Sequence, residues 1–110
     1  MSAAQVNNIF AALPESADEI FESLLATSGL KLERIISCGQ ATPPGEWYDQ
    51  VMDEWVLLLS GSASLLIEGE ETPRRLAAGD YLLLPAHCRH RVEWTDPLVK
   101  TVWLALHFQS

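Results

Sequence analysis

Basic residues are scarce in this sequence, and their scarcity excludes two classes of partner. The 110 residues include 7 lysines and arginines against 15 acidic residues, for a net charge of −8. Binding to nucleic acid or to an anionic membrane needs clustered basic side chains that neutralise phosphates. We therefore expect neither partner, and we look for a small-molecule ligand instead.

Cysteine and long hydrophobic runs are also lacking. Cys38 and Cys88 are the two cysteines, too few for a disulfide framework, although a single bridge between them stays open. The first residues do not form a basic segment followed by an apolar core, so no signal peptide is expected. The longest apolar runs are only a few residues, far short of a bilayer span. A cytoplasmic protein with two free thiols is the expectation.

The composition that remains is that of one globular domain. Hydrophobic residues make up 48% of the chain and charged residues 20%, which allows a sizeable core. The first 17 residues are mixed in character and include Pro14, so we expect an N-terminal arm over residues 1–17. The domain itself is expected over residues 18–110.

Most of the chain has the pattern of short strands. Apolar segments at 54–59, 63–68, 81–84 and 98–108 are separated by turn residues, and no long helical period follows residue 30. Strands of this length with frequent turns predict an all-β sandwich or barrel.

Residues 18–37 allow two interpretations. Apolar residues at 20, 21, 24 and 25 fit one helical face. The turn at Thr27-Ser28-Gly29 and the alternation that follows it fit a hairpin of two strands. The pattern favours strands, and the helix stays an alternative.

The stretch from Gly79 to His90 concentrates candidate functional residues. A turn is followed by the apolar run Tyr81–Leu84 and by Pro85, which cannot donate a ladder hydrogen bond and ends the strand. His87 and His90 come directly afterwards. Residues 91–94 alternate polar and apolar, which predicts a strand with His90, Val92 and Trp94 on one face.

These residues resemble the two motifs of the cupin superfamily, in its small single-domain, cupin 2-like form. Gly79, Pro85 and His90 have the spacing of the second motif. Glu54 and Gly61 have the spacing that ends the first motif. The resemblance covers roughly residues 40–108. The chain departs from the family twice: His87 stands where the second motif has glycine, and Trp47-Tyr48-Asp49-Gln50 replaces the His-x-His before Glu54.

The resemblance implies an all-β fold, a single cupin-type jelly-roll β-barrel with a cavity between two sheets. It also implies a homodimer formed through N-terminal strands. In the family, three histidines and a glutamate hold one divalent metal. Here Glu54 and His90 keep their matched positions, and the other candidate ligands near them are Gln50, Asp49 and His87. Such a mixed set of nitrogen and oxygen donors suits Mn, Fe, Ni or Zn.

Other residues are candidates for a substrate pocket. Tyr48 and Trp47 precede Glu54, and Arg91 and Trp94 follow His90. His107 is a spare imidazole, and a histidine in a strand is more often a packed residue than a ligand. If Glu54 points inward, its carboxylate needs a metal, an arginine or a hydrogen-bond partner, because an unpaired buried charge is costly.

Two functional hypotheses stay open from the sequence. One is a divalent-metal-dependent enzyme of the isomerase, oxygenase or decarboxylase type that acts on a small polar metabolite. The other is a metal-free ligand-binding or accessory barrel with a degenerate metal site. Neither the substrate nor the reaction can be read from the sequence, because one fold hosts many chemistries.

Overall fold

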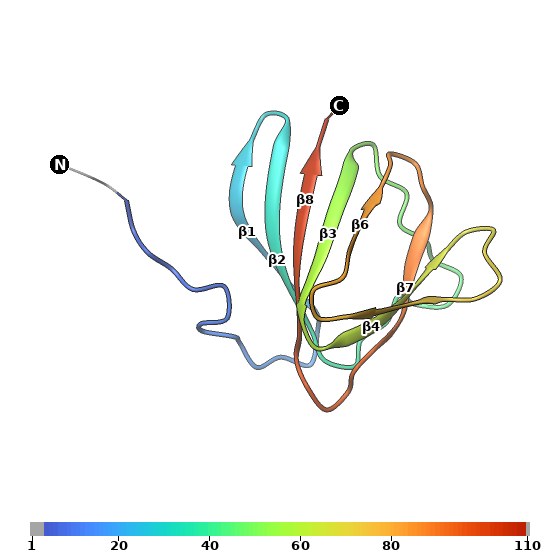
Figure 1. The fold of residues 1–110 in the computed structure, drawn as a ribbon, viewed down its shortest axis with the longest axis horizontal. Helices are drawn as coiled ribbons and strands as arrows, with labels where there is room; N and C mark the ends of the chain where they lie inside the picture. Colours follow the sequence, from blue (N-terminus) through green and yellow to red (C-terminus); the bar gives the residue numbers. More distant parts are fainter. Residues whose placement is uncertain (1–3, 110) are drawn as a thin grey trace.

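The computed structural model describes residues 4–109, and the only regular secondary structure in this range is strand (Figure 1). The strands are β1 (Ile20–Thr27), β2 (Leu30–Ser37), β3 (Asp53–Ser60), β4 (Ser62–Ile67), β5 (Arg74–Ala77), β6 (Tyr81–Leu84), β7 (His90–Thr95) and β8 (Thr101–Phe108). No helix in the described range could cross a membrane. The all-β prediction is confirmed.

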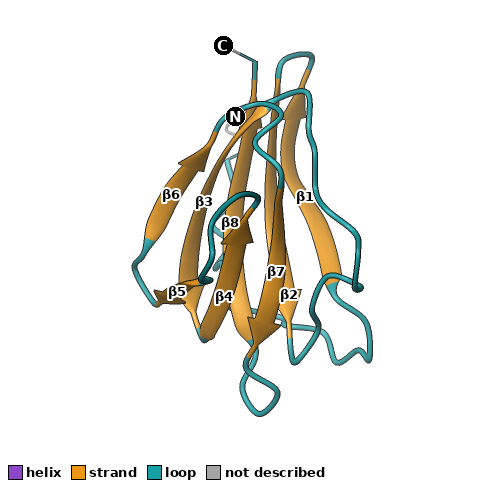
Figure 2. Cartoon of the chain, turned by 90° about the vertical axis from the view of Figure 1, so that its right-hand side faces the viewer, coloured by secondary structure: helices purple, strands orange, loops and turns teal. Residues whose placement is uncertain are grey.

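The strands form two antiparallel sheets that face each other. One sheet has the order β1-β2-β8-β3-β6, and the other has the order β5-β4-β7. Figure 2 shows the three-stranded sheet in front of the five-stranded one. The arrangement is the jelly roll that the motif resemblance implies.

Residues 20–37 form a hairpin, so the strand interpretation is correct and the helical alternative is wrong. β1 and β2 pair from Ile20↔Ile36 to Thr27↔Leu30 around the turn at Gly29. Tertiary pairing decides the matter, because β2 is also bonded along its length to β8. A helix at residues 20–25 would have left the other edge of β2 without the partners that β1 supplies.

Residues 4–19 precede β1 without forming a strand (Figure 1). This segment is docked on the five-stranded sheet: Arg34 donates from Nη1 to the carbonyls of Ile9 and Ala11, at 3.0 and 2.7 Å. Residues 1–3 lie outside the described range, and the domain boundary at residue 18 stays a prediction.

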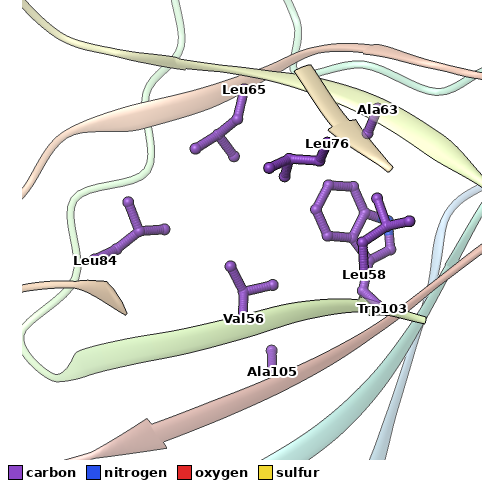
Figure 3. Packing of buried hydrophobic residues seen from close by; sticks show 8 residues of the cluster. All are labelled: Val56, Leu58, Ala63, Leu65, Leu76, Leu84, Trp103 and Ala105. Atoms are coloured by element: carbon purple, nitrogen blue, oxygen red, sulfur yellow. The ribbon is translucent and has the colours of Figure 1, made fainter. Parts of the chain in front are cut away.

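The core lies between the sheets, where inward-facing residues of each strand alternate with outward ones. Val56 and Leu58 of β3 are 4% and 1% exposed, and Ala63 and Leu65 of β4 face them from the other sheet. Figure 3 shows these side chains meeting around Trp103. The indole Nε1 of Trp103 donates to Ser37 Oγ at 3.2 Å, so its one polar atom is satisfied inside the core.

Gly61 makes the sharp connection from the five-stranded sheet to the three-stranded one. Its φ is +88°, and a Cβ at this position would lie 2.6 Å from the Cα of Thr101. Only glycine accommodates both the backbone angle and the close approach. The glycine of the first motif is therefore required by the fold.

Candidate functional site

A cavity of about 70 Å³ opens between the two sheets. Its wall combines an apolar part with a cluster of carboxylates and imidazoles. The lining residues are Glu19, Phe21, Glu33, Ile35, Tyr48, Gln50, Glu54, Val56, Leu65, Leu84, His90, Val92, Trp103 and His107.

Glu54 is the central polar residue of the cavity. It shares a face of β3 with Val56 and Leu58, so strand alternation directs it inward, and it is 7% exposed. Its Oε1 is buried without a hydrogen-bond partner. A buried carboxylate oxygen that lacks a donor is costly, so it needs a water, an ion or a ligand to satisfy it.

His90 lies on one side of Glu54, with its Nε2 3.5 Å from Oε1. This separation is too long for a well-formed hydrogen bond. The other ring nitrogen, Nδ1, donates to the carbonyl of Cys88 at 2.8 Å, which orients the ring. Burial lowers the pKa of His90, but the Glu54 carboxylate and the Cys88 carbonyl outweigh burial, and the net pKa is raised.

His107 lies on the other side of Glu54, because β8 pairs with β3 in the register Glu54↔His107. Its Nε2 is 3.8 Å from Glu54 Oε2 and 3.0 Å from Glu33 Oε1. Glu33 comes from β2, the next strand of the sheet. The structure thus brings together two imidazoles and two carboxylates from four strands: β2, β8 and β3 of the five-stranded sheet and β7 of the other sheet.

Sequence reasoning did not propose Glu33 and did not place His107 in the site. Alternation offered a signal for both: Trp103, Ala105 and His107 share one face of β8, and Glu33 shares a face of β2 with Ile35. That signal becomes specific only when the order β2-β8-β3 is known, since it brings these strands side by side.

Tyr48 and Gln50 both line the cavity. The role of Gln50 as a metal ligand and that of Tyr48 as a substrate contact stay predictions. The Tyr48 ring stacks on His90 at 5.5 Å. Burial raises the pKa of the Tyr48 phenol, and the Glu19 and Glu54 carboxylates raise it further. The phenol therefore stays protonated and can donate a hydrogen bond to a ligand.

Asp49 and His87, two of the candidate ligands, are not brought to Glu54. They pair with each other, Nδ1 to Oδ1, at 2.8 Å, with His87 66% and Asp49 48% exposed. Alternation explains the separation, because Asp49 points away from the face that carries Tyr48 and Gln50. The structure places neither residue in the cavity lining, and their role as ligands stays an untested prediction.

Three candidate pocket residues also lie outside the cavity lining: Trp47, Arg91 and Trp94. The guanidinium groups of Arg89 and Arg91 lie over the Trp47 ring, 5.8 and 5.9 Å from its centroid. Arg91 is further held by Glu93 at 3.0 Å and by the Thr42 carbonyl at 2.9 Å.

Trp94 is 38% exposed and lies against Arg75, outside the cavity. The expected shared face holds for His90 and Val92 and is wrong at Trp94. The cause is an irregularity in pairing: Ser64 and Leu65 of β4 are consecutive, but their partners are Trp94 and Val92. The extra residue reverses the alternation and turns Thr95 inward instead.

The resemblance implies a divalent metal, and the residues present show whether the cavity could hold one. Imidazole nitrogens and carboxylate oxygens are suitable types. However, the described residues contain no group of three or more His, Cys, Asp or Glu placed so that they could hold one metal ion. Tyr48 and Gln50 also replace the family's two histidines. The donor arrangement as it stands does not fit a metal.

Comparison with known proteins finds solved structures that are similar to this chain. No protein-family model matches the sequence, and no relative is found among curated proteins. A crystal structure from Ralstonia eutropha JMP134, named "putative mannose-6-phosphate isomerase", is 55% identical and has a TM-score of 0.94. The match covers 97% of this chain and 100% of that one.

More distant structures carry the cupin name. A cupin superfamily protein from Desulfitobacterium hafniense DCB-2 is 14% identical with a TM-score of 0.78, covering 100% of this chain and 94% of that one. A cupin 2 conserved barrel domain protein from Leptotrichia buccalis is 17% identical with a TM-score of 0.76, covering 94% of this chain and 47% of that one. These likenesses show the fold.

Proposed function

The chain shares the fold of solved cupin structures and is 55% identical to the Ralstonia eutropha protein, and from this premise we propose that its cavity binds a small polar metabolite and isomerises it by proton transfer. The observation that carries the proposal is Glu54: a buried carboxylate with a free oxygen, between two imidazoles, facing a cavity. Carboxylates and imidazoles that face a cavity in this way can act as general acids and bases.

The proposed reaction interconverts a hydroxy-ketone and a hydroxy-aldehyde. Glu54 removes the proton from the carbon beside the carbonyl group and returns it to the former carbonyl carbon. The hydroxyl proton moves from the hydroxyl oxygen to the carbonyl oxygen. One C–H and one O–H bond break and one of each forms, so no oxidant or further reactant enters the balance.

The residues around Glu54 have complementary parts in this scheme. His90 and His107 are placed to carry the oxygen-to-oxygen proton, because each imidazole is within 4 Å of the carboxylate, at 3.5 and 3.8 Å. Tyr48 donates from its protonated phenol to the substrate oxygen that gains negative charge. Glu33 is a positioning residue that fixes the His107 ring.

The name of the Ralstonia eutropha protein supports an isomerase class, since it describes that protein as a mannose-6-phosphate isomerase, itself marked putative. The substrate in that name is a property of that protein. The scheme here needs only a hydroxy-carbonyl compound that enters the cavity.

Metal dependence is a separate question within the proposal. A divalent Mn, Fe, Ni or Zn ion would polarise a carbonyl group if it were bound. Because the donors as arranged do not fit one ion, the proposed steps use only the chain's own residues. A cytoplasmic location likewise stays a prediction.

The test is hydrogen exchange in D2O with glyceraldehyde and dihydroxyacetone as probes, followed by NMR. Wild-type protein is expected to exchange the proton beside the carbonyl group and to interconvert the probes. Glu54→Gln should lower this rate by about 10²–10⁴-fold, the usual contribution of a general base. Glu71→Gln, an exposed carboxylate outside the cavity, is the matched control. Equal exchange by wild type and Glu54→Gln would remove Glu54 from the proposed role.

The second candidate function is a metal-free ligand-binding or accessory barrel. The observation that favours it is the replacement of the family's two histidines by Tyr48 and Gln50, both of which line the cavity. In this case glyceraldehyde or dihydroxyacetone would shift the NMR signals of Tyr48 and His90 on binding, but no deuterium would enter the bound probe.

A further inference from the structure

The polar part of the cavity wall is acidic. Its carboxylates are Glu19, Glu33 and Glu54, and no lysine or arginine of the described residues 4–109 lines it. The imidazoles of His90 and His107, and Lys31 beside Glu33, offset part of this charge. A cavity of this composition disfavours anions, since each carboxylate repels a negative ligand in a medium of low dielectric constant.

Six of the chain's seven basic side chains contact a surface carboxylate, a backbone carbonyl or a tryptophan ring outside the cavity. The seventh, Lys31, is 48% exposed and pairs with the cavity residue Glu33 at 3.1 Å. The seven are Lys31, Arg34, Arg74, Arg75, Arg89, Arg91 and Lys100. None is left to bind a phosphate group in the cavity.

The three cavity carboxylates differ in how well they are satisfied. Glu19 accepts from the Ser37 hydroxyl, and Glu33 contacts Lys31 and His107 at 3.1 and 3.0 Å. Glu54 Oε1 has no hydrogen-bond donor although the residue is more than nine-tenths buried. An oxygen in this state is stabilised by a ligand that brings a proton donor, and most by one that is positively charged.

We infer that the substrate of this cavity is a small unphosphorylated molecule whose inserted end carries an ammonium group. The inference rests on the proposed function only in taking this cavity as the substrate site. The ammonium lies against the acidic wall formed by Glu19, Glu33 and Glu54, where it donates to the free Oε1 of Glu54. The net charge of −8 adds a long-range attraction for cations.

The size of the cavity also restricts the substrate to a small group. About 70 Å³ is several times the roughly 10–15 Å³ that one water needs, which suits a short head group. A hexose phosphate is larger than such a group, and its phosphate would have to lie among carboxylates. The cavity therefore holds a short head group, with any remainder of the substrate outside.

The test compares three probes of one frame and different charge: 3-aminopropan-1-ol, propane-1,3-diol and 3-hydroxypropanoate. Binding is measured by NMR shifts of cavity residues on chelator-treated protein at low salt. We expect the amine to bind about tenfold more tightly than the diol, the scale of one charged hydrogen bond. The acid and mannose 6-phosphate should bind more weakly than the diol. Added salt should reduce the difference.

Variants assign the preference to the cavity. Glu19→Gln and Glu33→Gln should each lower the affinity for the amine and leave that for the diol nearly unchanged, while Glu71→Gln should change neither. The order of the three probes on wild-type protein tests the inference even if a cavity variant fails to fold. Equal affinities, or tighter binding of the acid or of mannose 6-phosphate, would overturn it.

The outcomes separate this inference from the proposed reaction. If the amine binds most tightly but no substrate exchanges its proton, the charge preference stands and the isomerase is wrong. If mannose 6-phosphate is bound and isomerised, the proton transfer stands and the charge preference is wrong. Tight binding of Zn²⁺ or Mn²⁺ that displaces the amine would assign the acidic wall to a metal and overturn the ammonium site.

Discussion

Tyr48 and His90 are joined through both their backbones and their rings. The two residues exchange backbone hydrogen bonds, Tyr48 N to His90 O at 2.7 Å and His90 N to Tyr48 O at 3.1 Å, and their rings stack at 5.5 Å with an angle of 27°. Tyr48 belongs to no strand, so this bridge is what places it in the cavity wall. The strand that carries His90 thus also positions the phenol.

The raised pKa of His90 predicts a pH-dependent stability. A folded-state pKa above the unfolded value means that the contribution is fully present below the unfolded pKa and is lost as the pH rises through the folded one. Denaturant unfolding of wild type and His90→Gln between about pH 6 and pH 8 should show a wild-type advantage that shrinks as the pH rises. A difference independent of pH would contradict the raised pKa.

Gly61→Ala is expected to destabilise the fold through its close contact with Thr101. The cost should be about 1–3 kcal/mol, the usual range for strained backbone, beyond that of Gly69→Ala. Gly69 is the matched control because its φ is +94° but a Cβ there meets nothing within 4 Å. The free energy of unfolding measures both. Equal losses would mean that the backbone angle alone, and not the contact, requires glycine at position 61.

Leu58→Ala tests the core between the sheets. Leu58 is 1% exposed, so its truncation should lower the free energy of unfolding by about 2–5 kcal/mol. Leu83→Ala is the control, because Leu83 is 53% exposed on β6 and its loss should cost less than about 0.5 kcal/mol. Similar costs for both would show that the face assignment of these strands is wrong.

Metal content is the direct measurement of cofactor use. Because the donors do not form a single site, we expect elemental analysis of untagged protein to find little Mn, Fe, Ni or Zn, even after incubation with each ion. Near-stoichiometric metal in wild type that is absent from His90→Ala would contradict this expectation and establish a metal centre that includes His90.

A homodimer through β1 also stays a prediction. β1 is an edge strand, and its Leu24 and Leu25 are 48% and 54% exposed, which favours pairing with a second copy of the chain. Light scattering coupled to gel filtration should give the dimer mass for wild type and the monomer mass for Leu25→Lys. Leu98→Lys, in a loop where Leu98 is 89% exposed, should stay dimeric. A monomeric wild type would exclude the dimer.

Local chemistry determined much of the fold from the sequence. Alternation and turn residues predicted strand 81–84 correctly and favoured strands over residues 18–37, since side chains at successive strand positions face opposite sheet surfaces. Motif spacing singled out Glu54 and His90, and the structure shows that both are buried. The final strand was expected from residue 98 and begins at Thr101, because Asp96 forms a turn with the amides of residues 98 and 99.

Tertiary structure alone decided the composition of the site. Glu33 and His107 are 74 residues apart, and they meet because β2 and β3 both pair with β8, an order that no local pattern encodes. One irregular pair between β4 and β7 turned Trp94 outward. Alternation determines which face a side chain takes, whereas the order of strands determines which side chains share a cavity, and that order depends on long-range pairing of the whole chain.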